Sequence, residues 1–259
     1  MRIGVCVKIV ADTESKISLN LDNRAVNKDS AELVINPYDE YALEEALKYK
    51  DKCSENEIVI FSVGEEKNIE LLRIALSMGA DRACYVVVDK QTYLDGLSIS
   101  NIIKRLAEVE KIDVLFMGKQ SVDDGNNQVV PMVGVLLDWA YATNVIKLQI
   151  EETHALATRQ AESGIREVLE LKKPFVISVT KGINEPRYPS LKGIMSAKKK
   201  EIKKVDVKDL GINIEELCSL EVEGYYTPKE NLQCKIIEGE PCEVSKELIS
   251  LLRYEAKVL

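Results

Sequence analysis

The chain of 259 residues has little of what most catalytic and metal sites need. It holds one histidine, His154, which excludes sites built from several histidines, and it lacks the nucleophile elbow of many Ser-His-Asp hydrolases. Its six cysteines are scattered, and no two stand at the two-residue spacing typical of zinc, iron–sulfur or thioredoxin-like sites. We therefore expect reduced thiols, no metal centre and no catalytic residues.

Further absences narrow the class of protein. No two of the 13 glycines are separated by a single residue, so the Gly-x-Gly-x-x-Gly dinucleotide fingerprint is missing, and the phosphate loop Gly-x-x-x-x-Gly-Lys is missing too. No apolar run approaches the ~20 residues of a bilayer span, and the amino terminus lacks the pattern of a signal peptide. A net charge of −8 argues against a general nucleic-acid binder. We expect a cytoplasmic protein with no membrane span and no nucleic-acid partner.

The first half of the chain alternates β-branched runs with helical patterns. One helix is predicted over residues 38–52, with Asn36 as its N-cap, Pro37 as its first helical residue and Asp39 near the capping-box position. Apolar stripes predict two more helices, around residues 69–76 and 99–106. The runs that predict strands are 3–10, 57–63, 82–88 and 113–118. This order predicts an α/β fold with a doubly wound, mostly parallel sheet, Rossmann-like and suited to an adenine nucleotide.

The second half of the chain has a different pattern. Strand-like runs with hairpin-length connections predict late antiparallel strands, at residues 144–151, 154–160, 167–171 and 174–180. From residue 185 onward there is no pattern of an autonomous core, only a helical stretch, a polar turn region and a final helix, at residues 207–217, 224–231 and 243–255. We therefore predict an α/β nucleotide-binding domain over residues 1–184 and, over residues 185–259, an arm that wraps a partner.

The segment 184–200 fits neither a buried strand nor an amphipathic helix. Pro186 and Pro189 fix the backbone and remove two donors, which predicts an irregular loop after the preceding strand. Apolar side chains stand there beside Arg187 and the run Lys198–Lys200, a composition typical of a partner-contact surface. We predict docking with Leu191 as the buried anchor and its neighbours as rim. The predicted docking residues are Tyr188, Leu191, Ile194, Met195 and Lys199.

A polar segment, 119–128, links the predicted strand 113–118 to a helix that contains Val129 and Val133. The amino terminus of that helix, with unpaired N–H groups, is suited to phosphate. Pro131 is tolerated because it falls in the first turn. The same pattern also fits a polar loop that ends in a helix cap and binds nothing.

Five motifs together resemble the electron transfer flavoprotein beta subunit family. The resemblance implies one half of a heterodimer, whose alpha subunit holds most of the FAD and which shuttles electrons from flavin dehydrogenases, such as acyl-CoA dehydrogenases, to a downstream acceptor. Such a chain is an electron carrier and not an enzyme. The motifs are Val5-Cys-Val-Lys8, Asn36-Pro-Tyr-Asp-Glu-Tyr-Ala-Leu-Glu44, Met78-Gly-Ala-Asp81, Gly118-Lys-Gln-Ser-Val-Asp-Asp124 with Asn127-Gln128, and residues 184–200.

The resemblance also implies a structural AMP in the beta subunit. One departure matters: Val130 stands where the family usually has glycine, and Gly125 replaces an acidic residue common in the respiratory branch. A valine where backbone approaches phosphate closely could shift or weaken the nucleotide. The implied AMP-binding residues are Cys6, Asn36, Pro37, Tyr38, Asp39, Val63, Asp123, Asp124, Gly125, Asn126, Asn127, Gln128, Val129, Val130, Met132 and Val133.

Several alternatives stay open at this point. Val129 and Pro131 look like electron-bifurcating relatives, whose beta subunit holds a second FAD in place of AMP and uses NADH. A free-standing adenine-nucleotide-binding regulatory domain is a second alternative, and a structural subunit with a degenerate nucleotide site is a third. The segment 162–168 resembles the family segment that approaches the flavin, although a hairpin ion pair explains Arg166 and Glu167 equally well.

Overall fold

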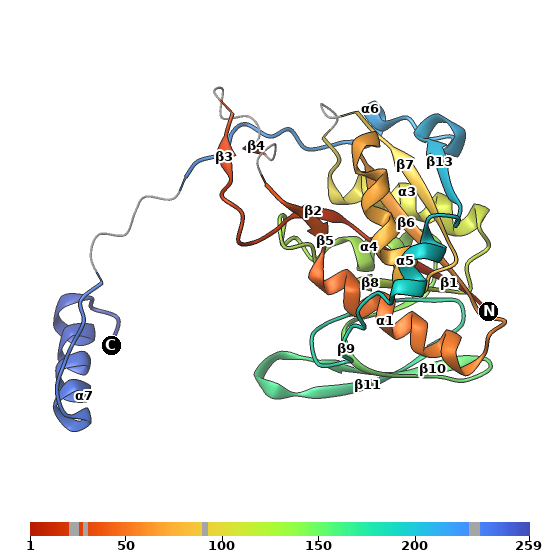
Figure 1. The fold of residues 1–259 in the computed structure, drawn as a ribbon. Coiled ribbons are helices and arrows are strands. Elements are labelled where there is room, and N and C mark those ends of the chain that lie inside the picture. The colour runs from red at the N-terminus through yellow and green to blue at the C-terminus, as the bar shows by residue number, and fades with distance from the viewer. Residues whose placement is uncertain (21–25, 28–30, 90–92, 228–233) are drawn as a thin grey trace.

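A nine-stranded sheet forms the centre of the computed structural model, which describes residues 1–20, 26–27, 31–89, 93–227 and 234–259 (Figure 1). The strand order is β11-β10-β9-β12-β8-β1-β6-β7-β13. From β9 to β13 in this order neighbouring strands are parallel, and β10 and β11 add an antiparallel hairpin at one edge. This confirms the predicted doubly wound, mostly parallel α/β sheet. The bounds are β1 (Arg2–Cys6), β6 (Glu57–Gly64), β7 (Arg82–Val87), β8 (Val114–Gly118), β9 (Ala140–Ile150), β10 (His154–Gln160), β11 (Arg166–Lys172), β12 (Phe175–Val179) and β13 (Ile202–Asp206).

Helices cover both faces of the sheet and bury two apolar clusters. One cluster joins α1 (Pro37–Lys52) and α2 (Leu72–Met78) to the sheet, and the 3-10 turn η1 (Glu66–Leu71) leads into α2. The other joins α3 (Gly96–Val109) and α4 (Val129–Leu137) to the opposite face. Gly79 ends α2 with a φ of 141°, a conformation that glycine adopts without strain. The helices predicted from the apolar stripes are therefore present on the two faces.

Two small sheets lie beside the large one: β2 (Ile9–Ala11) pairs with β5 (Leu33–Ile35), and β3 (Ser18–Leu19) with β4 (Val26–Asn27). The prediction of one strand over residues 3–10 is therefore wrong. The chain leaves the large sheet after Cys6, where the backbone N–H of Lys8 donates to the carboxylate of Asp39 instead of continuing the ladder.

The late strands are only partly antiparallel. β10 and β11 form the expected hairpin on β9, but β12 is inserted between β8 and β9 and is parallel to both. Every residue of β12 is buried, as is typical of a central strand covered on both faces. The prediction that residues 174–180 join an antiparallel addition is therefore wrong. The continuous apolar run in this segment was the signal that indicated a central strand.

The chain after residue 185 contributes two elements that the sequence did not predict. Residues Leu191–Ala197 form the short helix α5, with Ser190 as its N-cap, so the prediction of an irregular loop is wrong for this part. The hydroxyl of Ser190 accepts a hydrogen bond from the N–H of Gly193 at 3.0 Å. The strand β13 pairs with β7 at the edge of the large sheet.

Beyond Leu210 no residue that the structure describes is buried. The turn η3 (Val207–Leu210) and the short α6 (Ile214–Leu217) follow β13, and α7 (Pro241–Ser250) with the π turn η4 (Leu251–Glu255) lies away from the sheet (Figure 1). The predicted final helix is present. The predicted turn region 224–231 lies partly outside the described residues, and the division into a domain and an arm at residue 185 stays a prediction.

Candidate functional site

A cavity opens at the carboxyl ends of β1, β6 and β8. The order of the sheet reverses at β1, because β6 and β7 follow on one side of it and β8 and β12 on the other. Open α/β sheets bind ligands at such a switch point. The predicted residues that line the cavity are Cys6, Asn36, Asp39, Val63, Asp124, Asn126, Asn127, Gln128, Val129 and Val130.

The other predicted nucleotide residues lie around the cavity without lining it. Pro37 and Tyr38 begin α1, and Val133 is fully buried in the apolar cluster of α3 and α4. Asp123 forms an ion pair with Lys8, and Gly125 has a φ of 65°, which shapes the loop between β8 and α4. The remaining one, Met132, packs close to Gly96.

Asp39 forms the floor of the cavity. Its carboxylate accepts hydrogen bonds from the backbone N–H groups of Lys8 at 2.8 Å and Gly118 at 3.1 Å, so it ties α1 to the ends of β1 and β8. Burial raises the pKa of Asp39 to about 7, against the opposing effect of these hydrogen bonds. The predicted capping-box role of Asp39 is therefore wrong, because its partners come from the sheet.

Asn36 fastens the loop on the other side of the cavity. It precedes α1 as predicted, but its side chain makes no cap hydrogen bond. Its amide N–H₂ donates to the carbonyl of Gln120 at 2.9 Å, and its carbonyl oxygen accepts from the N–H of Val122 at 3.1 Å. The side chain of Asn36 thus shapes the polar segment 119–128 rather than the start of α1.

Three helices, α1, α3 and α4, begin at the cavity, and of these only α3 has a side-chain cap. The carboxylate of Asp95 caps α3, accepting from the backbone N–H of Ser98 at 2.8 Å and from its hydroxyl at 2.7 Å. Gln128 precedes α4 and makes no such bond with its side chain. The first N–H groups of a helix have no intrahelical acceptor. The start of α4 is therefore a place in the cavity where an anionic ligand group can accept hydrogen bonds from unpaired N–H groups.

A buried hydroxyl in the cavity has no partner. Ser62, near the end of β6, lines the cavity, and its Oγ finds no hydrogen-bond partner among the residues that the structure describes. A buried polar group without a partner is costly. The walls of the cavity are mostly apolar and include Val63, Ile99 and Ile103. The cavity therefore offers an apolar slot, and the Ser62 hydroxyl is buried beside it.

Lys8 pairs with two carboxylates at the rim of the cavity. Its ammonium group lies 2.7 Å from Asp123, 2.5 Å from Asp124 and 3.3 Å from the hydroxyl of Ser121. Burial lowers the pKa of Lys8, but the two carboxylates raise it by more, so the pKa lies above its ordinary value. The side chain stays charged and holds the loop after β8 against β1.

Several residues that line the cavity were not predicted from the sequence. They lie at the carboxyl ends of strands or at the starts of the helices that follow, and this position is the signal that could have identified them. The backbone N–H of Ser219 also donates to Asp95 at 3.1 Å, so the chain after α6 reaches the edge of the cavity. The missed lining residues include Lys8, Ser62, Tyr93, Asp95, Gly96 and Ile99.

The predicted docking residues lie on the surface of the segment 184–200. Tyr188 is 94% exposed, Leu191 83% and Met195 72%, and Ile194 and Lys199 are exposed as well. Such a group of exposed apolar side chains on a folded protein is typical of an interaction site. The structure therefore brings all five residues together on and beside α5.

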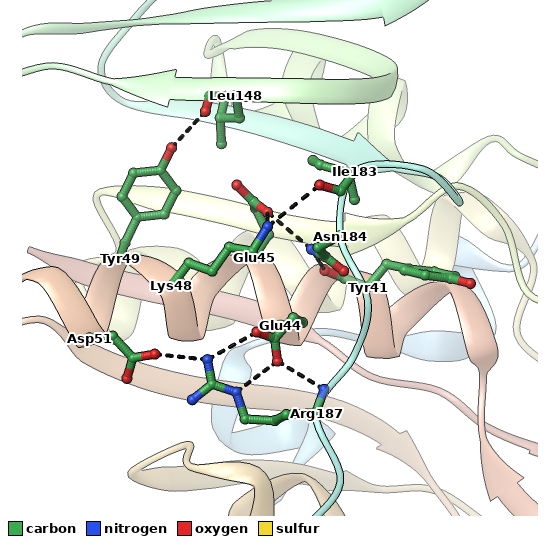
Figure 2. Close-up of polar contacts among 10 residues, drawn as sticks. All are labelled: Tyr41, Glu44, Glu45, Lys48, Tyr49, Asp51, Leu148, Ile183, Asn184 and Arg187. Carbon is green, nitrogen blue, oxygen red and sulfur yellow. Dashed lines mark hydrogen bonds and ion pairs between the residues drawn. The ribbon is translucent and has the colours of Figure 1, made fainter.

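The predicted cationic rim is only partly available. Arg187 is held by the carboxylates of Glu44 and Asp51 (Figure 2), and Lys200 donates to the carbonyls of Leu76 and Ala80. In the free chain these two cations are therefore paired, Arg187 with α1 and Lys200 with carbonyls at and just after the end of α2, and their role as a rim stays a prediction. The exposed cations beside the apolar side chains are Lys192, Lys198 and Lys199.

The hairpin β10–β11 contains the segment 162–168, which resembles the family segment that approaches the flavin. Glu167 lies opposite Arg159 in the ladder and forms an ion pair with it at 2.5 Å. Glu167 is thus in a hairpin ion pair, but with Arg159 rather than Arg166. Ile165 and Val168 leave apolar surface exposed on the same hairpin.

Within the residues described, no helix combines the length and the apolar character that a membrane crossing requires.

Comparison with known proteins places the chain in a family. The model of the electron transfer flavoprotein domain matches residues 25–210. The electron transfer flavoprotein subunit beta of Bacillus subtilis is 38% identical over 262 residues, covering 100% of both chains. The mitochondrial subunit beta of Arabidopsis thaliana is 36% identical over the same length, and that of Mus musculus is 38% identical over 216 residues, 83% of this chain and 84% of its own. The chain therefore belongs to the electron transfer flavoprotein family, among its beta subunits.

Proposed function

We propose that this chain is one half of a heterodimeric electron transfer flavoprotein. An alpha subunit holds most of the FAD, and the pair shuttles electrons from flavin dehydrogenases, such as acyl-CoA dehydrogenases, to a downstream acceptor. The observation that carries this proposal is the segment 184–200, which is fastened to α1 and α2 while Tyr188, Leu191 and Met195 stay exposed. A carrier that visits several partners needs such a surface in its free state.

In this proposal the chain is a carrier and not an enzyme. The bound flavin supplies the electron chemistry, and the protein supplies binding, orientation and electrostatics. The hairpin β10–β11 and the arm after Leu210 are the surfaces offered to the alpha subunit, because both leave apolar side chains uncovered, including Val168 and Leu248. The cytoplasmic location expected from the amino terminus stays a prediction.

We further propose AMP as the ligand of the cavity. The apolar walls suit an adenine ring, and the uncapped start of α4 suits a phosphate. Lys8 keeps the adjoining loop in place. The alternative is a second FAD of the bifurcating kind, which Val129 and Pro131 favour.

The test is to purify the chain together with its alpha subunit and follow the flavin absorbance. We expect a stable complex with the visible spectrum of bound flavin, and bleaching of that spectrum when an acyl-CoA dehydrogenase and its substrate are added. Failure to form the complex, or a flavin that no dehydrogenase reduces, would contradict the proposal. Reduction by NADH without any dehydrogenase would favour the bifurcating alternative.

A further inference from the structure

The carboxylate of Glu44 on α1 accepts hydrogen bonds from both the side chain and the backbone N–H of Arg187 (Figure 2). Oε2 accepts from the guanidinium Nε at 2.8 Å and from the backbone N–H at 3.1 Å, and Oε1 accepts from Nη2 at 2.9 Å. The same Nη2 donates to Asp51 at 2.8 Å. Glu44 is 5% exposed, so this fork is shielded from water on the carboxylate side.

The fork stands next to the docking side chains. Tyr188, the following residue, is the most exposed of them, and α5 begins at Leu191. Three residues before the fork, the side chain of Asn184 donates to the carbonyl of Tyr41 and to the carboxylate of Glu45, both at 3.0 Å. The entry to the docking segment is thus fastened to α1 at two points.

The exit from the segment is fastened to α2. The guanidinium of Arg73 donates to the carbonyls of Ala197 at 2.8 Å and Lys200 at 2.7 Å. A Cβ on Gly193 would collide with the carbonyl oxygen of Ser77, so α5 lies directly against α2. The segment between the two fastenings therefore has a fixed path, although Tyr188, Leu191 and Met195 stay exposed.

We propose that Arg187 and Glu44 are positioning residues for docking, and that they hold Tyr188 and Leu191 in their binding arrangement before the redox partner arrives. This inference rests on the docking function proposed above. A shielded ion pair is weak evidence for a role in stability, since packed apolar residues often stabilise a fold as well. A guanidinium that binds a carboxylate through two N–H groups instead fixes the direction of its own segment of chain. Ordering the segment in advance removes part of the entropy cost of association.

The variant Arg187→Lys keeps the charge and removes the fork. In the full heterodimer we expect docking to a flavin dehydrogenase, measured by the rate of flavin reduction at low partner concentration, to weaken about tenfold. The flavin absorbance should stay unchanged, and amide hydrogen exchange over residues 188–197 should become faster. Arg105→Lys is the matched control, because Arg105 pairs with Glu108 at 2.5 Å and donates to the carbonyl of Leu210 at 3.1 Å, away from the segment 184–200. In the assembled heterodimer it should change neither the reduction rate nor the exchange over residues 188–197.

Glu44→Gln tests the same pair from α1. It keeps the size of the side chain and removes its charge, so it should reproduce the loss of docking and the faster exchange. This second variant keeps the test decisive if Arg187→Lys does not assemble with the alpha subunit.

A double-mutant cycle with Leu191→Ala separates positioning from a purely structural role. If Arg187 acts through the placement of Leu191, Arg187→Lys should cost less than about twofold in the Leu191→Ala background. Additive losses of docking in the double mutant would overturn the positioning role. So would unchanged hydrogen exchange over residues 188–197. In either case, if Leu191→Ala still weakens docking, the docking surface itself would stand. If Leu191→Ala leaves docking unchanged, the docking surface itself is wrong, and the positioning role falls with it.

Discussion

The cavity and the segment 184–200, which we propose as sites for a nucleotide and for a redox partner, are built in opposite ways. The cavity lies inside the fold, and its shape follows from strand ends that Asp39 and Asn36 tie together. The segment 184–200 lies outside the sheet, and an ion pair with α1 and hydrogen bonds from Arg73 on α2 give it its path. A site at strand ends is fixed by the packing that makes the fold. A site on an added segment needs its own fastenings.

The two sites also differ in how their apolar surface is covered. The walls of the cavity, such as Val130 and Ile103, are already buried against α3 and α4. Leu191 and Met195 are left exposed, and burying one such side chain is worth about 1.5–3 kcal/mol. In the proposed docking role, this apolar surface would be buried only when a partner binds. Damage to the cavity should therefore reduce stability and nucleotide content, and damage to the segment should reduce docking alone.

The largest effect is expected from Gly118→Ala. A Cβ on Gly118 would meet the carboxylate of Asp39 and lie 2.7 Å from the backbone carbon of Tyr38, so the start of α1 must move. We expect a loss of about 3 kcal/mol or more in the free energy of unfolding, measured by denaturant titration of the heterodimer, with loss of the bound nucleotide. Gly96→Ala is the control for stability, because its new methyl group would meet only the flexible side chains of Gln128 at 3.3 Å and Met132 at 3.7 Å. Equal losses for both variants would contradict the account of the cavity floor.

Asp39→Asn should change how stability depends on pH. The folded-state pKa of about 7 lies above the ~3.9 of an unfolded aspartate, so the folded chain keeps this proton between these values while the unfolded chain releases it. Raising the pH from about 5 to 7 should therefore cost the wild type about 2–3 kcal/mol through this group, and the loss should level off above about pH 8. The difference in unfolding free energy between wild type and Asp39→Asn should shrink over this range. A difference independent of pH would show that Asp39 is ionised throughout.

Leu191→Ala should weaken docking by about 2 kcal/mol, because a central anchor makes its contacts only in the complex. The rate of electron transfer from the dehydrogenase and the flavin absorbance are measured together, and only the rate should fall. Val109→Ala, an exposed apolar residue at the end of α3, should leave both unchanged. Loss of flavin from Leu191→Ala would contradict the separation of the two sites.

Val130→Gly should have the smallest effect on the ligand. If the valine crowds a phosphate at the start of α4, its removal should raise nucleotide affinity by no more than about 1 kcal/mol, the worth of one charge at a helix terminus. Val133→Gly is the matched control, since Val133 lies on the same helix, is buried in the same cluster and does not line the cavity. Nucleotide content per folded protein is compared well below the unfolding temperature. Equal content in both variants would indicate that the backbone has already moved aside.

Much of the sheet could be predicted because its central strands are continuous β-branched runs, as in β6 and β8. The order of the strands could not, because a run such as Phe175–Val179 indicates a buried strand without naming its neighbours. β13 escaped prediction since Ile202–Asp206 buries only Val205 and has the lysine-rich composition of a surface segment.

The roles of single polar residues were harder to predict than their places. Asp39 fits a local capping pattern, yet the N–H of Gly118, 79 residues away, competes for its carboxylate. The sequence around Arg187 predicts a cationic rim of a partner-contact surface, but Glu44, 143 residues away, forms an ion pair with Arg187. In both cases a partner distant in sequence overrides the local pattern. Ser62 gives no signal in the sequence, because its isolation arises only from the packing around it.

The nucleotide content of the purified heterodimer tests the central claim most directly. Denaturing the complex and separating the released nucleotides by chromatography gives their identity and ratio. The account predicts about one FAD and one AMP per heterodimer, since the cavity at the switch point offers an apolar slot and the uncapped start of α4. Two FAD and no AMP would contradict it and favour the bifurcating alternative.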